Sequence, residues 1–239
     1  MNNRDYKQFA PDSVYHLYNR GVGKMDIFLD EEDYLFFLRR IKETLNPSLV
    51  SSAGRRYVPT KLPEGAFDLL LYTLMPNHIH LCAMQNTELP LSAFMSKVCT
   101  SYSKYFNKKY SRVGSVFQDQ FKAVIVTSNE QLLWLAAYIH NNPIKAGLVK
   151  DLSKYLYSSH LDYIGVRKGT LCKKDFILGQ YKSVESYEKA IFVIEEGLVL
   201  DDLKIDSDSD VFRWASSETD DAHLNTHLNT SEHRANSNN

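Results

Sequence analysis

The sequence predicts an α+β fold, in which strands and helices alternate along the first 150 residues. Three observations carry this prediction: short runs rich in β-branched and aromatic residues, longer runs with apolar residues three and four apart, and turn-forming residues between them. The chain has 239 residues, 44% of them hydrophobic and 24% charged, which is ordinary globular usage. Such a chain can bury a sizeable core, and disorder along its whole length is excluded.

The first two expected elements are a strand and a helix. Val14 to Asn19 is rich in β-forming residues and ends at a turn, which is typical of a strand. Asp30 to Leu45 opens with four acidic residues and continues with apolar residues at helical spacing, which predicts a helix. Residues 46–66 contain several prolines and glycines, so we expect a long irregular connection there.

Four further elements complete the pattern. Phe67 to Met75 and Ile79 to Met84 are apolar runs divided by a Pro-Asn pair, which predicts a hairpin of two central strands. Leu91 to Phe106 has the apolar periodicity of an amphipathic helix, and Phe121 to Val126 is again β-rich. The resulting order β-α-β-β-α-β predicts a ferredoxin-like sandwich.

A third helix is expected to be appended to this sandwich. Ser128 or Asn129 can cap its start, apolar residues recur along it at helical spacing, and Pro143 is expected to stop it. Tyr138 and Asn142 lie about 40° apart on this helix, so a phenol and a carboxamide could face the same target. The alternative is a tyrosine half-packed on a core helix and an asparagine that ends the helix before the proline.

Two histidines stand two residues apart just after the Pro-Asn turn. Side chains at this spacing project from one face of a strand, so His78 and His80 would present two imidazoles side by side. Two imidazoles can form part of a divalent-metal site, although a third ligand must come from elsewhere in the fold. A polar pair on a half-exposed strand is the alternative that the spacing leaves open.

The charge of the chain is unevenly distributed. Residues 1–200 carry 25 basic and 20 acidic side chains, whereas residues 201–239 carry 3 and 9. A modestly basic body is compatible with a polyanionic partner and equally with an ordinary solvated surface. Residues 201–239 are poor in apolar side chains and are predicted to form an acidic disordered tail.

The expected location of the chain is cytoplasmic, without a membrane partner. Its three cysteines lack the paired spacing of a disulfide framework or a structural zinc site. No apolar run is long enough to span a bilayer. Met1 is followed by polar residues rather than by the apolar core of a signal peptide.

Four blocks of sequence, taken in order, resemble the single-tyrosine HUH transposases. They are Tyr15–Gly21, Met75–Leu81, Phe117–Ala123 and Tyr138–Val149. The chain is most similar to the branch called REP-associated tyrosine transposases. Tyr157–Ser159 and Ile177–Tyr181 resemble the C-terminal extension of that branch, so the resemblance covers roughly residues 10–198.

The resemblance implies an enzyme and a domain organisation. Residues 1–150 would form a single-tyrosine HUH nuclease domain and residues 151–200 a C-terminal helical extension. The implied activity is that of a DNA transposase, a metal-dependent single-stranded DNA endonuclease and strand transferase. It would cleave hairpin-marked sites through a 5′-phosphotyrosine intermediate. Single-stranded DNA with hairpins is the implied partner, and a homodimer is possible within the family.

The resemblance also assigns roles to individual residues. Tyr138 would be the nucleophile, and His78, His80 and Asn142 would be metal ligands, with Asn141 as a fallback because Asn142 directly precedes a proline. Mg²⁺ or Mn²⁺ suits such a site, because positions must stay open for phosphate and water. The candidate DNA-contacting residues, for which plain solvated surface is the alternative, are Asn19, Arg20, Lys122 and Lys145.

Two other functional interpretations remain open at this point. One is a noncatalytic module of the same fold that recognises nucleic-acid hairpins, in which removal of the Tyr138 phenol would not change binding. The other is a metalloprotein that acts on a small molecule, which would require metal without binding DNA.

Overall fold

The computed structural model of the chain describes residues 8–49 and 61–195. Its strands form one antiparallel sheet in the order β2-β3-β1-β4. They are β1 (Ser13–Arg20), β2 (Phe67–Met75), β3 (His78–Gln85) and β4 (Lys122–Val126). The longer helices are α1 (Glu31–Leu45), α2 (Leu91–Lys109), α3 (Asn129–Lys145) and α6 (Val184–Glu195). Short helical segments are η1 (Val22–Lys24), η2 (Pro47–Leu49), η3 (Leu152–Lys154), α4 (His160–Tyr163) and α5 (Asp175–Leu178).

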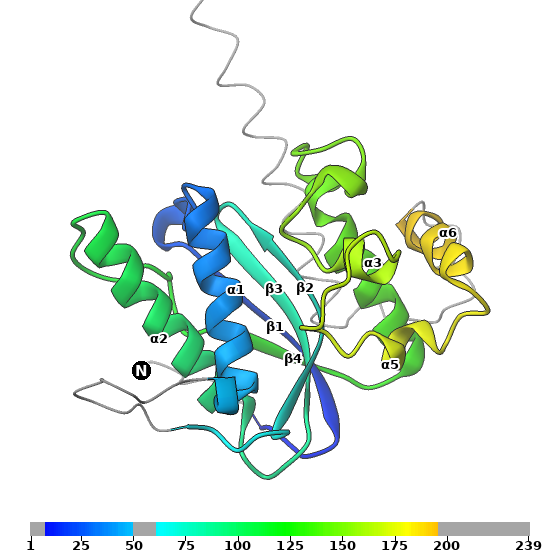
Figure 1. Cartoon of the computed structure of the whole chain (residues 1–239), viewed down its shortest axis with the longest axis horizontal. Coiled ribbons are helices and arrows are strands. Elements are labelled where there is room, and N and C mark those ends of the chain that lie inside the picture. The colour runs from blue at the N-terminus through cyan, green and yellow to red at the C-terminus, as the bar shows by residue number, and fades with distance from the viewer. Residues whose placement is uncertain (1–7, 50–60, 196–239) are drawn as a thin grey trace, which may run out of the picture.

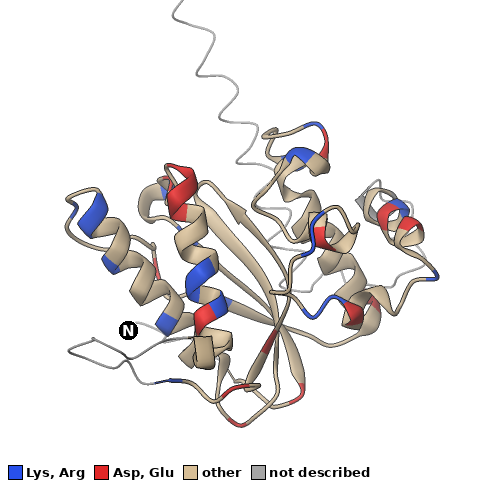
Figure 2. Cartoon of the chain, in the orientation of Figure 1, with Lys and Arg blue, Asp and Glu red and all other residues tan. Residues whose placement is uncertain are grey.

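The predicted α+β sandwich is confirmed, with the order β1-α1-β2-β3-α2-β4 followed by α3. Helices α1 and α2 cover one face of the sheet, and α3 with the shorter C-terminal helices covers the other (Figure 1). Charged residues gather mostly on the helices and loops, while most of the sheet carries none (Figure 2). Within the described ranges no helix is both long and apolar enough to cross a membrane.

The two faces of the sheet differ in character because side chains alternate along each strand. Tyr15 and Leu17 of β1 pack with Ile79 and Leu81 of β3 against α1 and α2, in a core built almost wholly of apolar side chains. On the opposite face, toward α3, lie His16, Tyr18 and Arg20 of β1 and His78 and His80 of β3, beside the apolar Val14 and Cys82. The fold therefore brings these five residues together in one layer under α3.

The prediction that Pro143 stops the third helix was wrong, because α3 continues to Lys145. A proline inside a helix lacks the N–H donor of one backbone hydrogen bond. Pro143 lies in the last turn of α3, where the loss of this one bond is tolerated. The last turn is closed instead by the Ala146 N–H, which donates to the Asn142 carbonyl at 2.9 Å, and by the Leu148 N–H, which donates to the Pro143 carbonyl at 2.9 Å. Asn142 therefore stays within the helix, on the same face as Tyr138.

Parts of the predicted organisation are not tested by these elements. The boundary near residue 150, between a nuclease domain and a helical extension, stays a prediction. Within the irregular connection expected at residues 46–66, η2 forms a single turn, and residues 50–60 lie outside the described part. The predicted acidic tail, residues 201–239, lies outside it as well.

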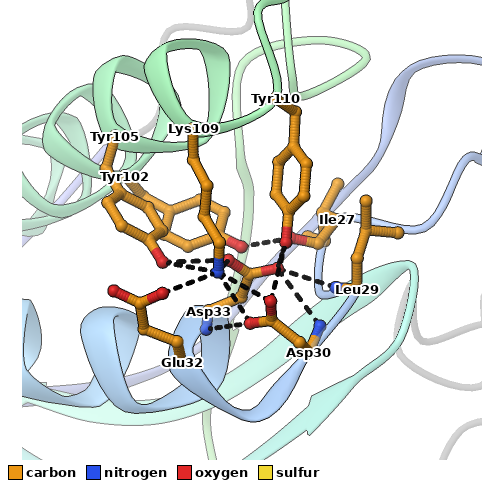
Figure 3. A network of polar contacts seen from close by, with 9 residues as sticks. All are labelled: Ile27, Leu29, Asp30, Glu32, Asp33, Tyr102, Tyr105, Lys109 and Tyr110. Carbon is orange, nitrogen blue, oxygen red and sulfur yellow. Dashed lines mark hydrogen bonds and ion pairs between the residues drawn. The ribbon is translucent and has the colours of Figure 1, made fainter.

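A polar network joins the start of α1 to the end of α2 (Figure 3). Asp33 is fully buried, and its carboxylate accepts hydrogen bonds from the Tyr105 hydroxyl at 3.0 Å, the Tyr110 hydroxyl at 2.8 Å and Lys109 Nζ at 2.9 Å. The same carboxylate accepts from the backbone N–H groups of Leu29 and Asp30, which satisfies donors at the helix start. A buried charge with this many partners is stabilising only while all of them remain.

We predict that Asp33→Asn lowers the free energy of unfolding by about 3 kcal/mol, because it leaves Lys109 without its buried counter-ion and turns acceptor sites into donors. The matched control is Glu32→Gln. Glu32 also pairs with Lys109, at 3.0 Å, but its side chain is 71% exposed, so the loss should stay below about 1 kcal/mol. Urea unfolding measures both. Equal losses in the two variants would show that burial does not set the contribution of Asp33.

Candidate active site

The candidate site lies on the sheet face that α3 covers, where β1 and β3 pair. In the register of these strands Arg20 is opposite His78 and Tyr18 is opposite His80. Directly opposed residues of antiparallel strands project from the same face. Strand pairing therefore brings both histidines of the predicted pair beside an arginine and a tyrosine. His80 is fully buried and His78 half-buried, so the pair is not an exposed surface pair.

A third histidine joins the pair, and the sequence analysis assigned it no role. His16 of β1 is fully buried, and its Nε2 lies 3.0 Å from Nδ1 of His80. A hydrogen bond at this ring nitrogen fixes the orientation and tautomer of His80, which is how a metal-ligating histidine is normally held. One feature of the sequence pointed to His16: it lies four residues before Arg20 on the same strand, so both side chains project from the same face. The contact with His80 depends on the register of two strands more than 60 residues apart. Alternation of side chains along one strand does not predict this register.

The three imidazoles are held neutral by their surroundings. Burial lowers the pKa of His16 to about 3. Burial, together with the positive charge of Arg20, lowers the pKa of His78 to about 3, against an opposing hydrogen bond from Asn142. Burial and the neighbouring histidines also lower the pKa of His80 well below its ordinary value. Neutral imidazoles are the form that binds metal ions.

Tyr138 of α3 lies in the same layer. Its ring meets the His80 ring edge-to-face, with centroids 5.6 Å apart, and it stacks on Trp134 at 5.3 Å with the planes 6° apart. Only 5% of Tyr138 is exposed. Lys145, one of the predicted DNA contacts, places its Nζ 5.4 Å from the centre of the same ring. The structure thus brings the predicted nucleophile and the histidine pair together within one chain.

The two candidate asparagines point in different directions. Asn142 donates from Nδ2 to the Tyr138 carbonyl at 3.1 Å, and its side chain is near enough to His78 to raise the pKa of that imidazole, against the larger effect of burial. Asn141 is fully buried and donates to the Ile191 carbonyl of α6 at 2.9 Å, away from the histidines. The fallback residue Asn141 is therefore occupied elsewhere, and Asn142 is the carboxamide next to the histidine pair.

The donor set fits a divalent cation. Among residues 8–49 and 61–195 no group of three or more His, Cys, Asp or Glu side chains is arranged to hold a metal ion. A third protein ligand for His78 and His80 would then be a group of another kind, and the Asn142 carboxamide is next to them. Imidazoles bind divalent transition ions, and a carboxamide oxygen is a donor that Mg²⁺ and Mn²⁺ also accept, so the donor set fits a divalent cation without selecting one.

The remaining predicted contact residues line a cavity beside His78. This cavity has a volume of about 240 Å³, and Arg20 and Lys122 contribute to its wall. Asn19 lies on the opposite strand face from Arg20. Its carboxamide already makes two hydrogen bonds: it accepts from the Arg20 N–H at 2.9 Å and donates to the Asp119 carbonyl at 3.4 Å. Asn19 therefore holds the neighbouring loop in place as well as lining the cavity.

The side of α3 that faces away from the site is fixed by a chain of buried hydrogen bonds. Nδ1 of His140 lies 2.6 Å from the Tyr187 hydroxyl of α6, and Nε2 lies 2.8 Å from the Ser159 hydroxyl. Ser159 in turn donates to the Tyr72 carbonyl of β2 at 3.1 Å. These distances are satisfied together when Tyr187 donates to a neutral His140 and His140 donates to Ser159. Burial keeps His140 neutral by lowering its pKa.

Comparison with known proteins gives a family match. Residues 36–142 match the family model described as IS200-like transposase, and this range contains His78, His80, Tyr138 and Asn142. The match agrees with the family that the sequence motifs indicate and supports a DNA transposase enzyme. The comparison with curated proteins found no match.

Two solved structures are similar to the chain. One is a REP-associated tyrosine transposase bound to a REP hairpin, with 15% identity, a TM-score of 0.49, and coverage of 65% of this chain and 81% of that chain. The other is a putative transposase from Deinococcus radiodurans R1, with 14% identity, a TM-score of 0.35, and coverage of 58% of this chain and 96% of that chain.

We predict that the free energy of unfolding falls as the pH is lowered from 7 to 5. The pKa of His16 is about 3 in the folded chain and near 6.5 when unfolded, so only the unfolded chain takes up a proton in this range. Each such histidine contributes a slope of up to about 1.4 kcal/mol per pH unit. Urea unfolding in EDTA at pH 7, 6 and 5 measures it. Constant stability over this range contradicts the prediction, and His16→Gln should reduce the slope.

Proposed function

We propose that this chain, which matches the IS200-like transposase family over residues 36–142, is a single-tyrosine HUH enzyme that acts as a metal-dependent endonuclease and strand transferase for single-stranded DNA. One observation carries the proposal. The Tyr138 phenol lies against the His80 imidazole, with ring centroids 5.6 Å apart, in a layer that also contains His78 and Asn142. A tyrosine beside a neutral, metal-competent histidine pair combines a nucleophile with a means of stabilising charge on the phosphate, which together support phosphoryl transfer to a phenol.

The proposed reaction is an exchange of phosphodiester bonds. The Tyr138 oxygen attacks a phosphorus atom of the DNA backbone, and the bond from that phosphorus to the 3′ oxygen breaks. The phenolic proton balances the new 3′ hydroxyl. The products are a 5′-phosphotyrosine and a free 3′ end, so the energy of the bond is retained and a 3′ hydroxyl can reverse the step without ATP.

Each residue of the site has a distinct part in this proposal. A free phenol has a pKa near 10, so the attack needs charge stabilisation at neutral pH. Lys145, whose Nζ lies 5.4 Å from the Tyr138 ring centre, supplies a positive charge where the phenol loses its proton. Arg20 and Lys122 line the cavity beside His78 and would bind backbone phosphates.

His78, His80 and Asn142 would hold Mg²⁺ or Mn²⁺. Such an ion neutralises charge on the phosphate and on the leaving oxygen when it is bound. The protein residues contribute by presenting neutral imidazoles, and His16 fixes the orientation of His80 through the 3.0 Å contact between their ring nitrogens.

The substrate class that we propose is single-stranded DNA with hairpins. A REP hairpin is also what the transposase in the first solved structure above is bound to. The nucleophile and the histidine pair come from one chain here, so the arrangement does not need a second copy to complete it. A homodimer is suggested only by the family resemblance and stays a proposal.

We predict that wild-type protein forms a covalent DNA adduct that Tyr138→Phe cannot form. The experiment incubates each protein with single-stranded hairpins taken from the DNA that flanks its gene, in Mn²⁺ or EDTA, and detects adducts on a denaturing gel. Tyr181→Phe removes a phenol outside the site and is the matched control. The adduct should require Mn²⁺ and survive in Tyr181→Phe.

Other outcomes would support the alternative functions. Hairpin binding without any adduct would favour the noncatalytic recognition module. Mn²⁺ binding without DNA binding would favour a metalloprotein that acts on a small molecule. An adduct that persists in Tyr138→Phe would assign the nucleophile to another residue.

We predict that His16→Ala weakens Mn²⁺ binding about 10- to 100-fold, because His80 loses the partner that orients it. Isothermal titration of the free protein with Mn²⁺ measures this affinity. His16→Gln should restore part of it, since a carboxamide oxygen can accept from the His80 ring. Val124→Ala, which removes methyl groups opposite His16 on β4, is the control for loss of packing alone. An unchanged Mn²⁺ affinity in His16→Ala would contradict the orienting role.

A further inference from the structure

A small cavity lies between the end of β1, the start of β3 and the loop that precedes β4. Its volume is about 240 Å³. It borders the candidate metal ligand His78, so whatever occupies it is next to the reacting phosphate of the proposed function. Its lining residues are Tyr18, Asn19, Arg20, His78, Gln118, Asp119, Gln120 and Lys122.

The loop wall of this cavity is held rigidly to the end of β1. The Gln118 N–H donates to the Arg20 carbonyl at 2.8 Å, and the Val22 N–H donates to the Val116 carbonyl at 3.0 Å. Gly21 and Phe117 form an isolated antiparallel bridge between these two bonds. The pairing of β1 is thus extended past the strand end, and the wall is in place before a ligand arrives.

The chemistry of the lining falls into three groups. Arg20 and Lys122 are positively charged, Tyr18 is aromatic, and the loop residues are two carboxamides and one carboxylate. The side chains of Gln118, Asp119, Gln120 and Lys122 make no hydrogen bond or ion pair with any residue of ranges 8–49 and 61–195, so these groups can bond a ligand. Carboxamides and carboxylates are the side chains that read the edges of bases, and aromatic rings stack on base faces.

We propose that this cavity binds one unpaired nucleobase of the DNA strand, next to the phosphate that Tyr138 attacks. Gln118, Asp119 and Gln120 read its edge, Tyr18 stacks on its face, and Arg20 and Lys122 hold the flanking phosphates. This inference rests on the proposed function, because it takes single-stranded DNA as the substrate.

A nucleobase fits this lining better than a lone phosphate does. Two cations would suffice for a phosphate, and the Asp119 carboxylate would repel it. The same carboxylate is an acceptor for the amino group of a base. The volume, smaller than that of a drug-sized ligand site, suits a single planar ring system rather than a duplex.

The test moves an abasic nucleotide along the unpaired positions of the flanking-DNA hairpins. Binding is followed by fluorescence anisotropy with Tyr138→Phe protein, and adduct formation with wild-type protein and Mn²⁺. We expect one abasic position, adjacent to the cut, to weaken binding about 10-fold or more, since loss of one stacked and hydrogen-bonded base is typically that large. The double variant Gln118→Ala, Gln120→Ala should bind the intact hairpin as weakly and be insensitive to the same abasic position.

The control variant is Gln180→Ala, an exposed glutamine in the C-terminal part of the chain. It should bind like the unsubstituted protein and keep the abasic sensitivity. Adduct formation with equal tolerance of every abasic position would overturn the nucleobase site and leave the proposed function standing. A sensitive position without any adduct would support the site and overturn the proposed catalysis. No hairpin binding at all would overturn both.

Discussion

The pairing of β1 with β3 is the constraint on which the candidate site depends. In this register His78 and His80 lie on the same face as Tyr18 and Arg20, and His16 reaches His80. A slip of one residue would turn these side chains toward α1 and α2, into an apolar core that cannot accommodate them. The apolar residues between them fix the register, since Leu17 and Ile79 are fully buried on the opposite face. The hydrophobic core thus determines where the polar chemistry lies.

Helix α3 completes the site because its two faces have different partners. Tyr138 faces the histidines, while His140, two residues later, is bonded to Ser159 and Tyr187 on the far side. The buried chain from α6 through His140 to β2 gives the helix one rotational setting. In that setting Tyr138 and Asn142 both face the histidine pair, and Asn141 is bonded to α6.

The sequence predicted the features that depend on local periodicity, namely the strands, the helices and the residues that share a face of each. Alternation along a strand placed His78 and His80 on one face, and helical spacing placed Tyr138 with Asn142. It could not show that His16 contacts His80 or that residues 118–120 close a cavity beside His78, because both depend on how distant segments pair. Two local inferences also needed tertiary structure. Pro143 is accommodated because it lies near the helix end, and adjacent residues Asn19 and Arg20 have different environments because strand neighbours face opposite ways.

The stack of Trp134 on Tyr138 gives the site an intrinsic optical probe. The indole and phenol rings lie 5.3 Å apart with planes only 6° from parallel, and the chain has two tryptophans in all. Indole emission responds to the polarity and charge of its immediate surroundings. A charged group attached to the phenol would change those surroundings directly. The intrinsic fluorescence of Trp134 therefore reports on the chemical state of Tyr138, and events at this residue can be followed in real time without a label.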